Sequence, residues 1–319
     1  MYIGVDIGGT NIAVGLVDGG CNIIERVKAP TLPKRGARAV IDDVSRLCFE
    51  LAGKAGVKPR DIERIGMVAP GSVDAPAGII IFAGNIPFDN SPVAEWMRES
   101  WSCPIFVEND ANAAALGEVY AGAAKGRSSV LMITLGTGVG GGIVLDGKVY
   151  SGFNGTAGEV GHMVVEAGGR GCTCGRAGCW EAYASATGLI SMTREAMEKY
   201  PGGAMSRITG ELGKVSGKTA FLAAREGDAA GRGVVDAYIR YLSIGLANLI
   251  NIFQPEAVCI GGGVCNEGEY LMKPLIEATR REQFKGSPRL TEICAAALGN
   301  DAGIIGAAML GARKDGLLK

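Results

Sequence analysis

Short apolar runs alternate with longer amphipathic stretches along the whole chain. In the first half, the pattern predicts helices at 36–56, 91–101 and 111–124 and strands at 2–8, 11–18, 22–29, 63–69 and 104–108. In the second half, it predicts strands at 129–135, 140–146, 257–260 and 291–295 and helices at 180–198, 218–227, 231–253, 267–283 and 300–313. The alternation of the two element types indicates α/β layers in both halves.

A faint internal repeat relates the two halves of the chain. Residues 3–19 match residues 131–147 without a gap, and each copy contains a strand, a Gly/Thr turn, a second strand and an Asp-Gly pair typical of hairpins. Glycine-rich chains align by chance, so the match gains weight from the similar make-up of the half-chain that follows each copy. We therefore predict two α/β lobes with a cleft between them, and we expect the last helix to return to the first lobe.

Composition restricts the class of protein. With 319 residues the chain is long enough for two core-forming domains, and its net charge of −1 without a basic block indicates neither a nucleic-acid nor an acidic-membrane partner. The apolar stretch at 244–253 is interrupted by Asn248 and Asn251 and is too short to span a membrane. The chain start lacks the basic region of a signal peptide, so its nine cysteines indicate reduced thiols and metal ligands in a cytoplasmic protein.

The strongest chemical signal is a cluster of metal-ligand side chains in a glycine-rich segment. One imidazole and three thiolates, a complete tetrahedral set for zinc, lie close together in the chain: His162, Cys172, Cys174 and Cys179. Ordinary buried cysteines or a disulfide are the alternatives, but a disulfide leaves one cysteine over and is strained by the tight spacing. We therefore predict a structural zinc ion. Glu159 and Glu181 flank the cluster, so the metal would fix two carboxylates as part of a binding site.

Two Gly/Thr turns and a third glycine run are candidates for nucleotide binding. Such turns present backbone N–H groups to phosphate oxygens because no Cβ lies in the way. Plain hairpins are the alternative, and a single turn would favour it, but three such sites indicate a nucleotide. The candidate residues are Asp6, Gly8, Gly9, Thr10 and Asn11, then Thr134, Gly136, Thr137 and Gly138, and finally Gly261, Gly262 and Gly263. Asp6 ends its strand and is a candidate ligand for Mg²⁺, held directly or through water.

Two segments resemble nucleotide-binding motifs in their residues but not in their predicted structural context. Residues 136–141 match the dinucleotide pattern G-x-G-x-x-G, but residues 143–145 continue as a strand where a dinucleotide fold requires a helix. Residues 213–219 resemble a P-loop, but Leu212 stands where the first glycine belongs and no apolar strand precedes it. We predict a loop before a helix start there.

Asp110 lies where an apolar strand ends and an alanine-rich helix begins. It can cap the helix, a role that contributes about 0.5–2 kcal/mol. It can also act as a general base at the carboxyl end of a strand, and the two roles are compatible. Phosphoryl transfer to a sugar hydroxyl needs a carboxylate to accept the proton, and Asn109 beside it can bind a neighbouring hydroxyl.

These motifs resemble those of the ROK family of sugar kinases. The resemblance extends over essentially the whole chain, in the strings at 6–10, 108–113, 135–142, 158–162, 172–181 and 260–264. It implies an α/β, actin-like (ribonuclease H-like) two-lobed ATPase fold with a central cleft. The lobes would be residues 1–110 plus 300–319 and residues 111–299. It also implies transfer of the γ-phosphoryl of ATP to the 6-hydroxyl of a hexose, and the strings at 84–87, 108–118 and 180–185 resemble those of members that act on glucose.

The resemblance implies a role for each candidate residue. Asp110 would be the base, and the residues that hold the sugar would be Asn85, Asn109, Asp110, Glu159, His162 and Glu181. His162 would ligate zinc through one ring nitrogen and donate to the sugar from the other, because a bound metal fixes the tautomer. Mg²⁺ would be the catalytic metal, and the family suggests a homodimer or homotetramer.

Other members of the same family are alternatives. Kinases for N-acetylmannosamine, fructose or allose share these motifs, as do kinases that use polyphosphate as the donor. Sugar-responsive repressors carry a helix-turn-helix ahead of the first strand, whereas this strand starts at residue 2. A non-catalytic sugar sensor is disfavoured because Asp6 and Asp110 are both present.

Overall fold

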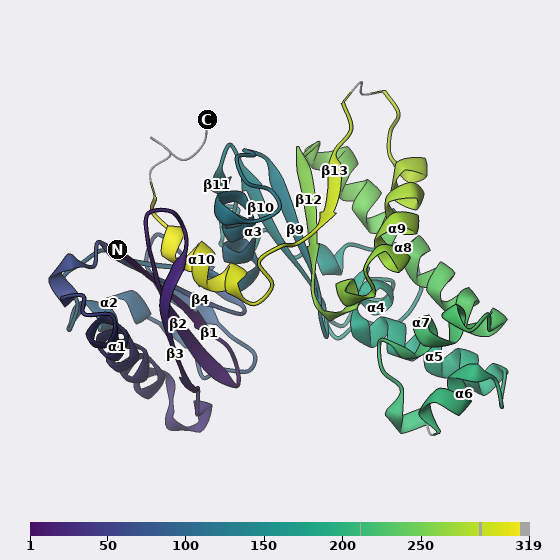
Figure 1. Ribbon diagram of the computed structural model, residues 1–319, viewed down its shortest axis with the longest axis horizontal. Coiled ribbons are helices and arrows are strands. Elements are labelled where there is room, and N and C mark those ends of the chain that lie inside the picture. Colours follow the sequence, from purple (N-terminus) through teal and green to yellow (C-terminus); the bar gives the residue numbers. More distant parts are fainter. Residues whose placement is uncertain (211, 287–288, 313–319) are drawn as a thin grey trace. The chain divides into compact units, whose positions relative to one another are not determined.

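The computed structural model describes residues 1–210, 212–286 and 289–312, and these form two compact units (Figure 1). Among the described residues, unit 1 comprises 1–132, 142–158 and the chain from 296 onward, and unit 2 comprises 133–141 and 159–295. The division into lobes after residue 110 and before residue 300 stays a prediction.

Unit 1 is built on a five-stranded sheet in the order β3-β2-β1-β4-β8. Its strands are β1 (Tyr2–Ile7), β2 (Asn11–Val17), β3 (Ile23–Pro30), β4 (Arg64–Ala69) and β8 (Ile105–Asn109). The first three strands pair antiparallel, whereas β1, β4 and β8 run parallel. Parallel strands end at the same edge of a sheet, so β1 brings Asp6, and β8 brings Asp110, to one edge.

Helices cover both faces of this sheet (Figure 1). They are α1 (Ala37–Lys54), α2 (Val93–Arg98), α3 (Asp110–Ala121) and α10 (Asp301–Met309). One core cluster joins Ile3 and Met67 to apolar residues of α1 and α2, and the other joins Val68 to apolar residues of α3 and α10. Met67 and Val68 are neighbours in β4 and point to opposite faces, so the two helix pairs lie on opposite sides. Residue 313, the predicted end of the last helix, lies outside the described residues.

Helices α3 and α10 pack backbone to backbone. A Cβ atom on Gly306 would lie 1.7 Å from the carbonyl oxygen of Ala113, and one on Gly117 would lie 2.5 Å from that of Ala302. Only glycine permits so close an approach, and here it occurs in both directions. The helix that begins at Asp110 is therefore fixed firmly against the last helix of the chain.

The second five-stranded sheet repeats the order of the first, as β11-β10-β9-β12-β13. Its strands are β9 (Val130–Leu135), β10 (Val139–Leu145), β11 (Lys148–Val149), β12 (Ala257–Gly261) and β13 (Glu292–Ala295). β9 has the 6 residues of β1 and β10 has the 7 residues of β2, each displaced along the chain by the same interval. The structure therefore confirms the predicted repeat.

A small sheet in unit 1 was not predicted. It has the order β5-β6-β7, with β5 (Ser72–Asp74), β6 (Ile79–Phe82) and β7 (Asp89–Ser91). Strands of three or four residues have too few positions to display an alternating pattern. β7 also occupies the start of the predicted helix at 91–101, which is correspondingly shorter.

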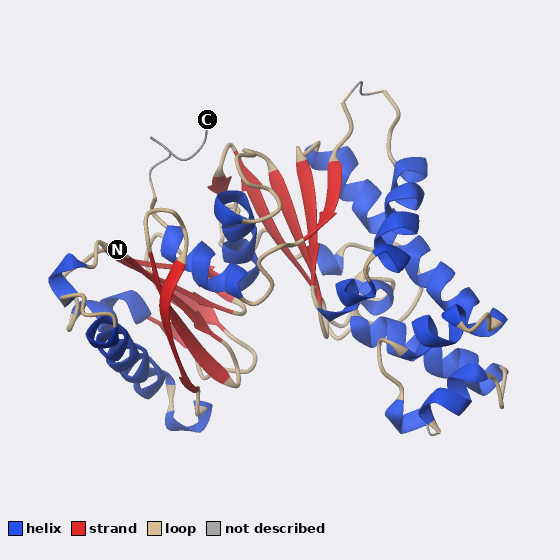
Figure 2. Ribbon diagram, viewed as in Figure 1, coloured by secondary structure: helices blue, strands red, loops and turns tan. Residues whose placement is uncertain are grey.

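The rest of unit 2 is mostly helical (Figure 2). Its helices are α4 (Glu181–Ala184), α5 (Ala186–Lys199), α6 (Ala204–Thr209), α7 (Thr219–Arg225), α8 (Ala229–Phe253) and α9 (Glu269–Glu282). The single helix predicted at 180–198 is wrong. Ser185 is extended between α4 and α5, and its side chain accepts the Gly188 N–H as the N-cap of α5.

Short 3₁₀ helices complete the chain. They are η1 (Pro33–Arg35), η2 (Pro59–Asp61), η3 (Val160–His162), η4 (Leu212–Lys214) and η5 (Gly263–Glu267). The P-loop look-alike consists of η4 and the loop before α7, and strand β10 follows the dinucleotide look-alike, as predicted. Across the described residues, we find no helix with the length and apolarity that crossing a membrane requires.

Candidate active site

The first Gly/Thr turn joins β1 to β2 and is anchored in the core of unit 1. The Gly8 N–H donates to the Asn11 carbonyl oxygen at 2.9 Å, which closes the turn. Thr31, which is fully buried, donates its hydroxyl to the Gly8 carbonyl oxygen at 2.6 Å and its N–H to that of Thr10 at 3.0 Å. The Thr10 side chain is exposed and can reach a ligand.

Asn85, predicted to bind the sugar, lies beside this turn. A Cβ atom on Gly9 would lie 3.3 Å from the Asn85 Cβ. Within unit 1, a residue that is predicted to bind the sugar therefore lies next to a residue that is predicted to bind phosphate. A methyl group on Gly9 would make a tight contact with Asn85, which would have to shift by a few tenths of an ångström.

Asp6 and Asp110 form a pair of desolvated carboxylates at the edge of the first sheet. Burial and then the nearby Asp110 carboxylate raise the pKa of Asp6 from 3.8 to about 6. Burial likewise raises the pKa of Asp110, although the N–H of Ala111 counteracts it. Two mutually repelling oxygen ligands in a partly dry site fit a divalent cation such as Mg²⁺, which would neutralise them.

Capping of α3, the alternative role considered for Asp110, belongs instead to Asn109. The Asn109 Oδ1 accepts the N–H groups of Ala111 at 2.9 Å and Asn112 at 3.2 Å. Its Nδ2 donates to the Gly71 carbonyl oxygen at 3.0 Å. Asp110 is therefore the first helical residue, where the positive end of the helix dipole favours its ionised form.

Glu108 supports the Asp110 region from beneath and was missed in the sequence. Its buried carboxylate accepts the Asn109 N–H at 2.9 Å, the Asn112 side-chain amide at 3.0 Å and the Ser151 hydroxyl at 3.1 Å. It thus joins the end of β8, the first turn of α3 and the loop after β11. A charged residue at the end of an apolar strand was the available signal, but its partners are remote in the chain.

The four predicted metal ligands meet in unit 2. Their ligand atoms all lie within 4.8 Å of one another, with the Cys172 Sγ 3.6 Å from the His162 Nδ1 and the Cys174 Sγ 3.6 Å from the Cys179 Sγ. A disulfide requires about 2.05 Å, so the alternative of a disulfide is wrong for this arrangement. Tetrahedral zinc with Zn–S bonds of about 2.3 Å separates its ligands by nearly the observed distances. The donor set therefore fits zinc.

His162 is also placed for the double role that the resemblance implies. Its Nδ1 faces the cysteines, and its Nε2 lies 3.9 Å from the Glu159 Oε2. A metal on Nδ1 leaves the proton on Nε2, so this nitrogen becomes a donor on the side of Glu159. Glu159 is exposed and can therefore reach a ligand.

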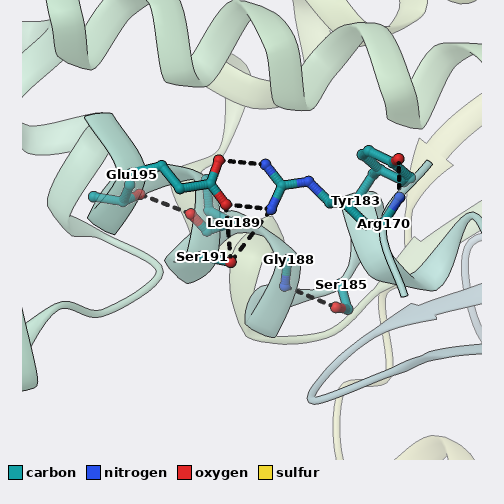
Figure 3. A network of polar contacts seen from close by, with 8 residues as sticks. Arg170, Tyr183, Ser185, Gly188, Leu189, Ser191 and Glu195 are labelled. Carbon is teal, nitrogen blue, oxygen red and sulfur yellow. Dashed lines mark hydrogen bonds and ion pairs between the residues drawn. The ribbon is translucent and has the colours of Figure 1, made fainter. Parts of the chain in front are cut away.

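We call residues 162–179, which carry the four predicted metal ligands, the metal-binding segment, and a salt bridge braces it. Figure 3 shows the Arg170 guanidinium facing the Glu195 carboxylate of α5 through two parallel contacts of 2.5 Å each. The Arg170 N–H donates to the Tyr183 hydroxyl at 2.7 Å, and its guanidinium lies 5.5 Å from the centre of that ring. A bidentate pair backed by an aromatic ring fixes the segment more firmly than an isolated surface ion pair.

The second Gly/Thr turn lies against Glu181. The Val139 N–H donates to the Glu181 Oε2 at 3.0 Å, and a Cβ atom on Gly138 would lie 2.3 Å from the same oxygen. The third glycine run is nearby, since a Cβ atom on Gly262 would lie 2.2 Å from the Leu135 carbonyl oxygen. Unit 2 thus gathers the second turn, the third run and one of the predicted sugar residues.

The predicted site residues fall into two sets, one in each unit. Unit 1 holds the first turn, Asn85, Asn109 and Asp110, and unit 2 holds the second turn, the third glycine run, Glu159, Glu181 and the four metal ligands. Within each set, the structure places residues close together that are far apart in the sequence. Their roles toward sugar and nucleotide stay predictions.

The chain is similar to known proteins over nearly its full length. Residues 2–314 match the model of the ROK family. The chain is 38% identical to the protein named glucokinase of Halalkalibacterium halodurans, over 97% of this chain and 94% of that one.

Solved structures agree in fold. A ROK family glucokinase from Streptomyces griseus, in complex with glucose and AMPPNP, superposes with a TM-score of 0.77 at 37% identity, covering 97% of this chain and 98% of that one. A ROK hexokinase from Thermus thermophilus gives a TM-score of 0.81 at 37% identity, covering 97% and 96%. The fold is therefore the predicted actin-like (ribonuclease H-like) α/β fold, and the chain belongs to the ROK family.

Proposed function

We propose that the protein is an ATP-dependent glucokinase, which transfers the γ-phosphoryl group of ATP to the 6-hydroxyl of glucose. The observation that carries the proposal is the pair of desolvated carboxylates at Asp6 and Asp110, beside a Gly/Thr turn at the end of β1. The similarity to proteins named glucokinase, at 38% identity over nearly the full chain, supports glucose as the acceptor.

Asp110 is the proposed general base. Burial raises its pKa from the ordinary aspartate value, which makes its carboxylate a better proton acceptor than an exposed one. The side chains of Asn109 and Glu108 fix the backbone on both sides of Asp110, because they accept the N–H groups of Asn109, Ala111 and Asn112 at 2.9–3.2 Å. The carboxylate is thus held in place before the sugar binds, so little reorganisation is needed when the 6-hydroxyl loses its proton.

Asp6 is the proposed ligand of Mg²⁺, directly or through water. When bound with ATP, the ion would neutralise charge on the phosphoryl oxygens during transfer. Asp6 would then be ionised despite its burial, because a cation nearby offsets the effect of the Asp110 carboxylate on its pKa. The two Gly/Thr turns and the glycine run at 261–263 are proposed to contact the nucleotide.

Sugar hydroxyls are proposed to contact Asn85, Asn109, Glu159, His162 and Glu181. Carboxylates and neutral amides suit a hexose because they accept and donate several hydrogen bonds to hydroxyl groups. Zinc on His162 and the three cysteines is proposed to be structural, since four protein ligands leave no position for a water. We further propose a cytoplasmic enzyme that forms a homodimer or homotetramer.

A coupled assay across a panel of hexoses, with ATP and polyphosphate as donors, tests this function. Glucose with ATP is expected to give the highest kcat/KM, and the reaction is expected to require Mg²⁺. The panel includes N-acetylmannosamine, fructose and allose, because hexoses of similar shape differ in only a few hydroxyl contacts. A preference for another sugar or for polyphosphate would reject the glucokinase proposal, and no turnover with any acceptor would reject a kinase.

A further inference from the structure

The second Gly/Thr turn, at residues 136–139, is held by a neighbouring segment rather than by its own strands alone. We call residues 181–187 the bracing segment. The Glu181 Oε2 accepts the Val139 N–H at 3.0 Å, the Ala186 N–H donates to the Gly136 carbonyl oxygen at 2.9 Å, and the Thr187 hydroxyl donates to the Thr137 carbonyl oxygen at 2.8 Å. Three successive parts of the turn are therefore attached to one short stretch of chain.

The attachment leaves little freedom at the turn. A side chain on Gly138 would displace the Glu181 carboxylate, because a Cβ atom would lie 2.3 Å from the Glu181 Oε2 and 3.1 Å from its carboxyl carbon. Thr187 is exposed, so burial does not explain how its hydroxyl is directed. The hydroxyl is directed instead by its hydrogen bond to the Thr137 carbonyl oxygen.

The bracing segment is itself rigidly mounted. It follows Cys179, one of the four clustered metal ligands, and Trp180, which is fully buried. The Trp180 Nε1 donates to the Tyr241 carbonyl oxygen of α8 at 2.8 Å, and a Cβ atom on Gly245 would lie 2.1 Å from the indole ring. Helix α8 and the metal cluster therefore set where Glu181 and Thr187 lie.

We propose that the bracing segment positions the second turn for nucleotide phosphates, with Thr187 as a positioning residue. The two carboxylate oxygens of Glu181 have different neighbours in this arrangement, because Oε2 accepts the Val139 N–H at 3.0 Å and Oε1 lies 3.9 Å from the Cys172 Sγ. The inference rests on the proposed function. It extends the influence of the metal-binding segment from the sugar to the nucleotide, and it gives Thr187 a role that its exposed position alone does not suggest.

Substitution of Thr187 tests this inference. The quantities to measure are the affinity for a non-hydrolysable ATP analogue with Mg²⁺, by calorimetry, and KM for ATP and for glucose. Thr187→Val, which keeps the shape but loses the hydroxyl, is expected to weaken binding of the analogue and raise KM for ATP by about 3- to 10-fold. KM for glucose is expected to change less than about two-fold, since the carboxylate of Glu181 is untouched.

Two further variants serve as controls. Thr187→Ser retains the hydroxyl and is expected to keep wild-type affinity for the analogue. Thr193→Val lies on the same helix and removes a hydroxyl that donates to the Leu189 carbonyl oxygen at 2.7 Å, away from the turn. It is expected to leave the affinity for the analogue unchanged, even if it lowers the melting temperature.

Two results would overturn the inference. One is wild-type affinity for the analogue in Thr187→Val, and the other is an equal loss in Thr187→Ser and Thr187→Val. Hydrogen exchange of residues 133–140 separates this failure from failure of the proposed function. If the wild type binds no nucleotide, the kinase proposal is rejected. Faster exchange in Thr187→Val but not in Thr187→Ser still supports a positioning role for the bracing segment. Equal exchange in the two variants rejects that role.

Discussion

The two Gly/Thr turns begin from related sequences but are stabilised in different ways. The first turn has its own carboxylate, Asp6, and its Gly8 carbonyl is held by a threonine hydroxyl from the core, Thr31. The second turn has Thr134 in place of Asp6, and a threonine hydroxyl from the surface, Thr187, holds its Thr137 carbonyl. The carboxylate that contacts it, Glu181, belongs to the bracing segment.

The two copies of the repeat therefore carry different chemical groups. The first copy keeps the acidic group that suits a cation and lies beside the proposed base. The second copy has no acidic group in the turn and depends on an insertion between β11 and β12 for its support. We therefore expect substitutions near the first turn to affect chemistry or stability, and substitutions near the second to affect ligand affinity.

The largest effect is expected for Asp110→Asn, which removes the proposed base near the first turn. We expect kcat to fall about 10²- to 10⁴-fold, because no carboxylate remains to accept the proton of the 6-hydroxyl. KM for glucose should change little, since the amide still forms a hydrogen bond. Steady-state kinetics measures both, with the exposed Asp61→Asn as a control that should behave as wild type. Retained turnover would remove Asp110 as the base.

The next effect is expected for Cys179→Ser, which removes one of the four predicted metal ligands. We expect zinc content, by elemental analysis, to fall from about one ion per chain, and KM for glucose to rise about 10-fold or more, because the chain before Glu181 is loosened. If the brace operates, KM for ATP rises as well. Cys103→Ser, outside the cluster, is the control. A metal-free wild type that is fully folded would contradict the zinc assignment.

Asp6→Asn is expected to raise the Mg²⁺ concentration that turnover requires and yet stabilise the ligand-free protein. The Asp6 pKa is raised from 3.8 to about 6, so the folded state binds the proton more tightly than the unfolded chain does. Ionised Asp6 therefore lowers stability as the pH rises from about 4 to about 6, by on the order of 1–3 kcal/mol in total.

Urea unfolding between pH 4 and pH 8, without added Mg²⁺, measures this effect. The Asn variant should exceed the wild type in unfolding free energy above pH 6, and the gap should close toward pH 4. Added Mg²⁺ and ATP should also narrow it, since they stabilise ionised Asp6. A variant that is less stable than the wild type at pH 8 would mean that the carboxylate has a compensating partner in the folded protein.

The smallest effects are expected from the paired variants Thr31→Val and Thr187→Val. Loss of the buried Thr31 hydroxyl leaves the Gly8 carbonyl without this donor and should lower the free energy of unfolding by about 1–3 kcal/mol. The same change at exposed Thr187 should cost less than about 1 kcal/mol, because water can replace the hydroxyl. Equal losses of stability in the two variants would show that the turns are supported alike.

The sequence predicted what depends on local pattern. The strands of both hairpins followed from apolar runs and Asp-Gly pairs, and the four metal ligands followed from their types and spacing in a glycine-rich segment. The break of the helix at Ser185 could not be predicted, because α4 and α5 together have a nearly continuous helical pattern. The break depends on the hydrogen bond that the Gly188 N–H donates to the Ser185 side chain.

The supporting residues of the site were the part that sequence reasoning missed. Glu108 accepts a hydroxyl from Ser151, and Thr31 and Thr187 donate to carbonyls in distant turns. These partners meet only after the chain has folded, and backbone carbonyls leave no trace in the choice of side chain. Asn109 and Asp110 are both good N-caps, so local preference could not decide which residue begins α3.

A crystal structure with glucose and a non-hydrolysable ATP analogue would test the proposed roles of Asp6 and Asp110 directly. We predict the 6-hydroxyl of glucose within about 3 Å of an Asp110 carboxylate oxygen, and a Mg²⁺ ion near Asp6 that also contacts the phosphates. Glucose bound with its 6-hydroxyl remote from Asp110 would contradict the assigned chemistry.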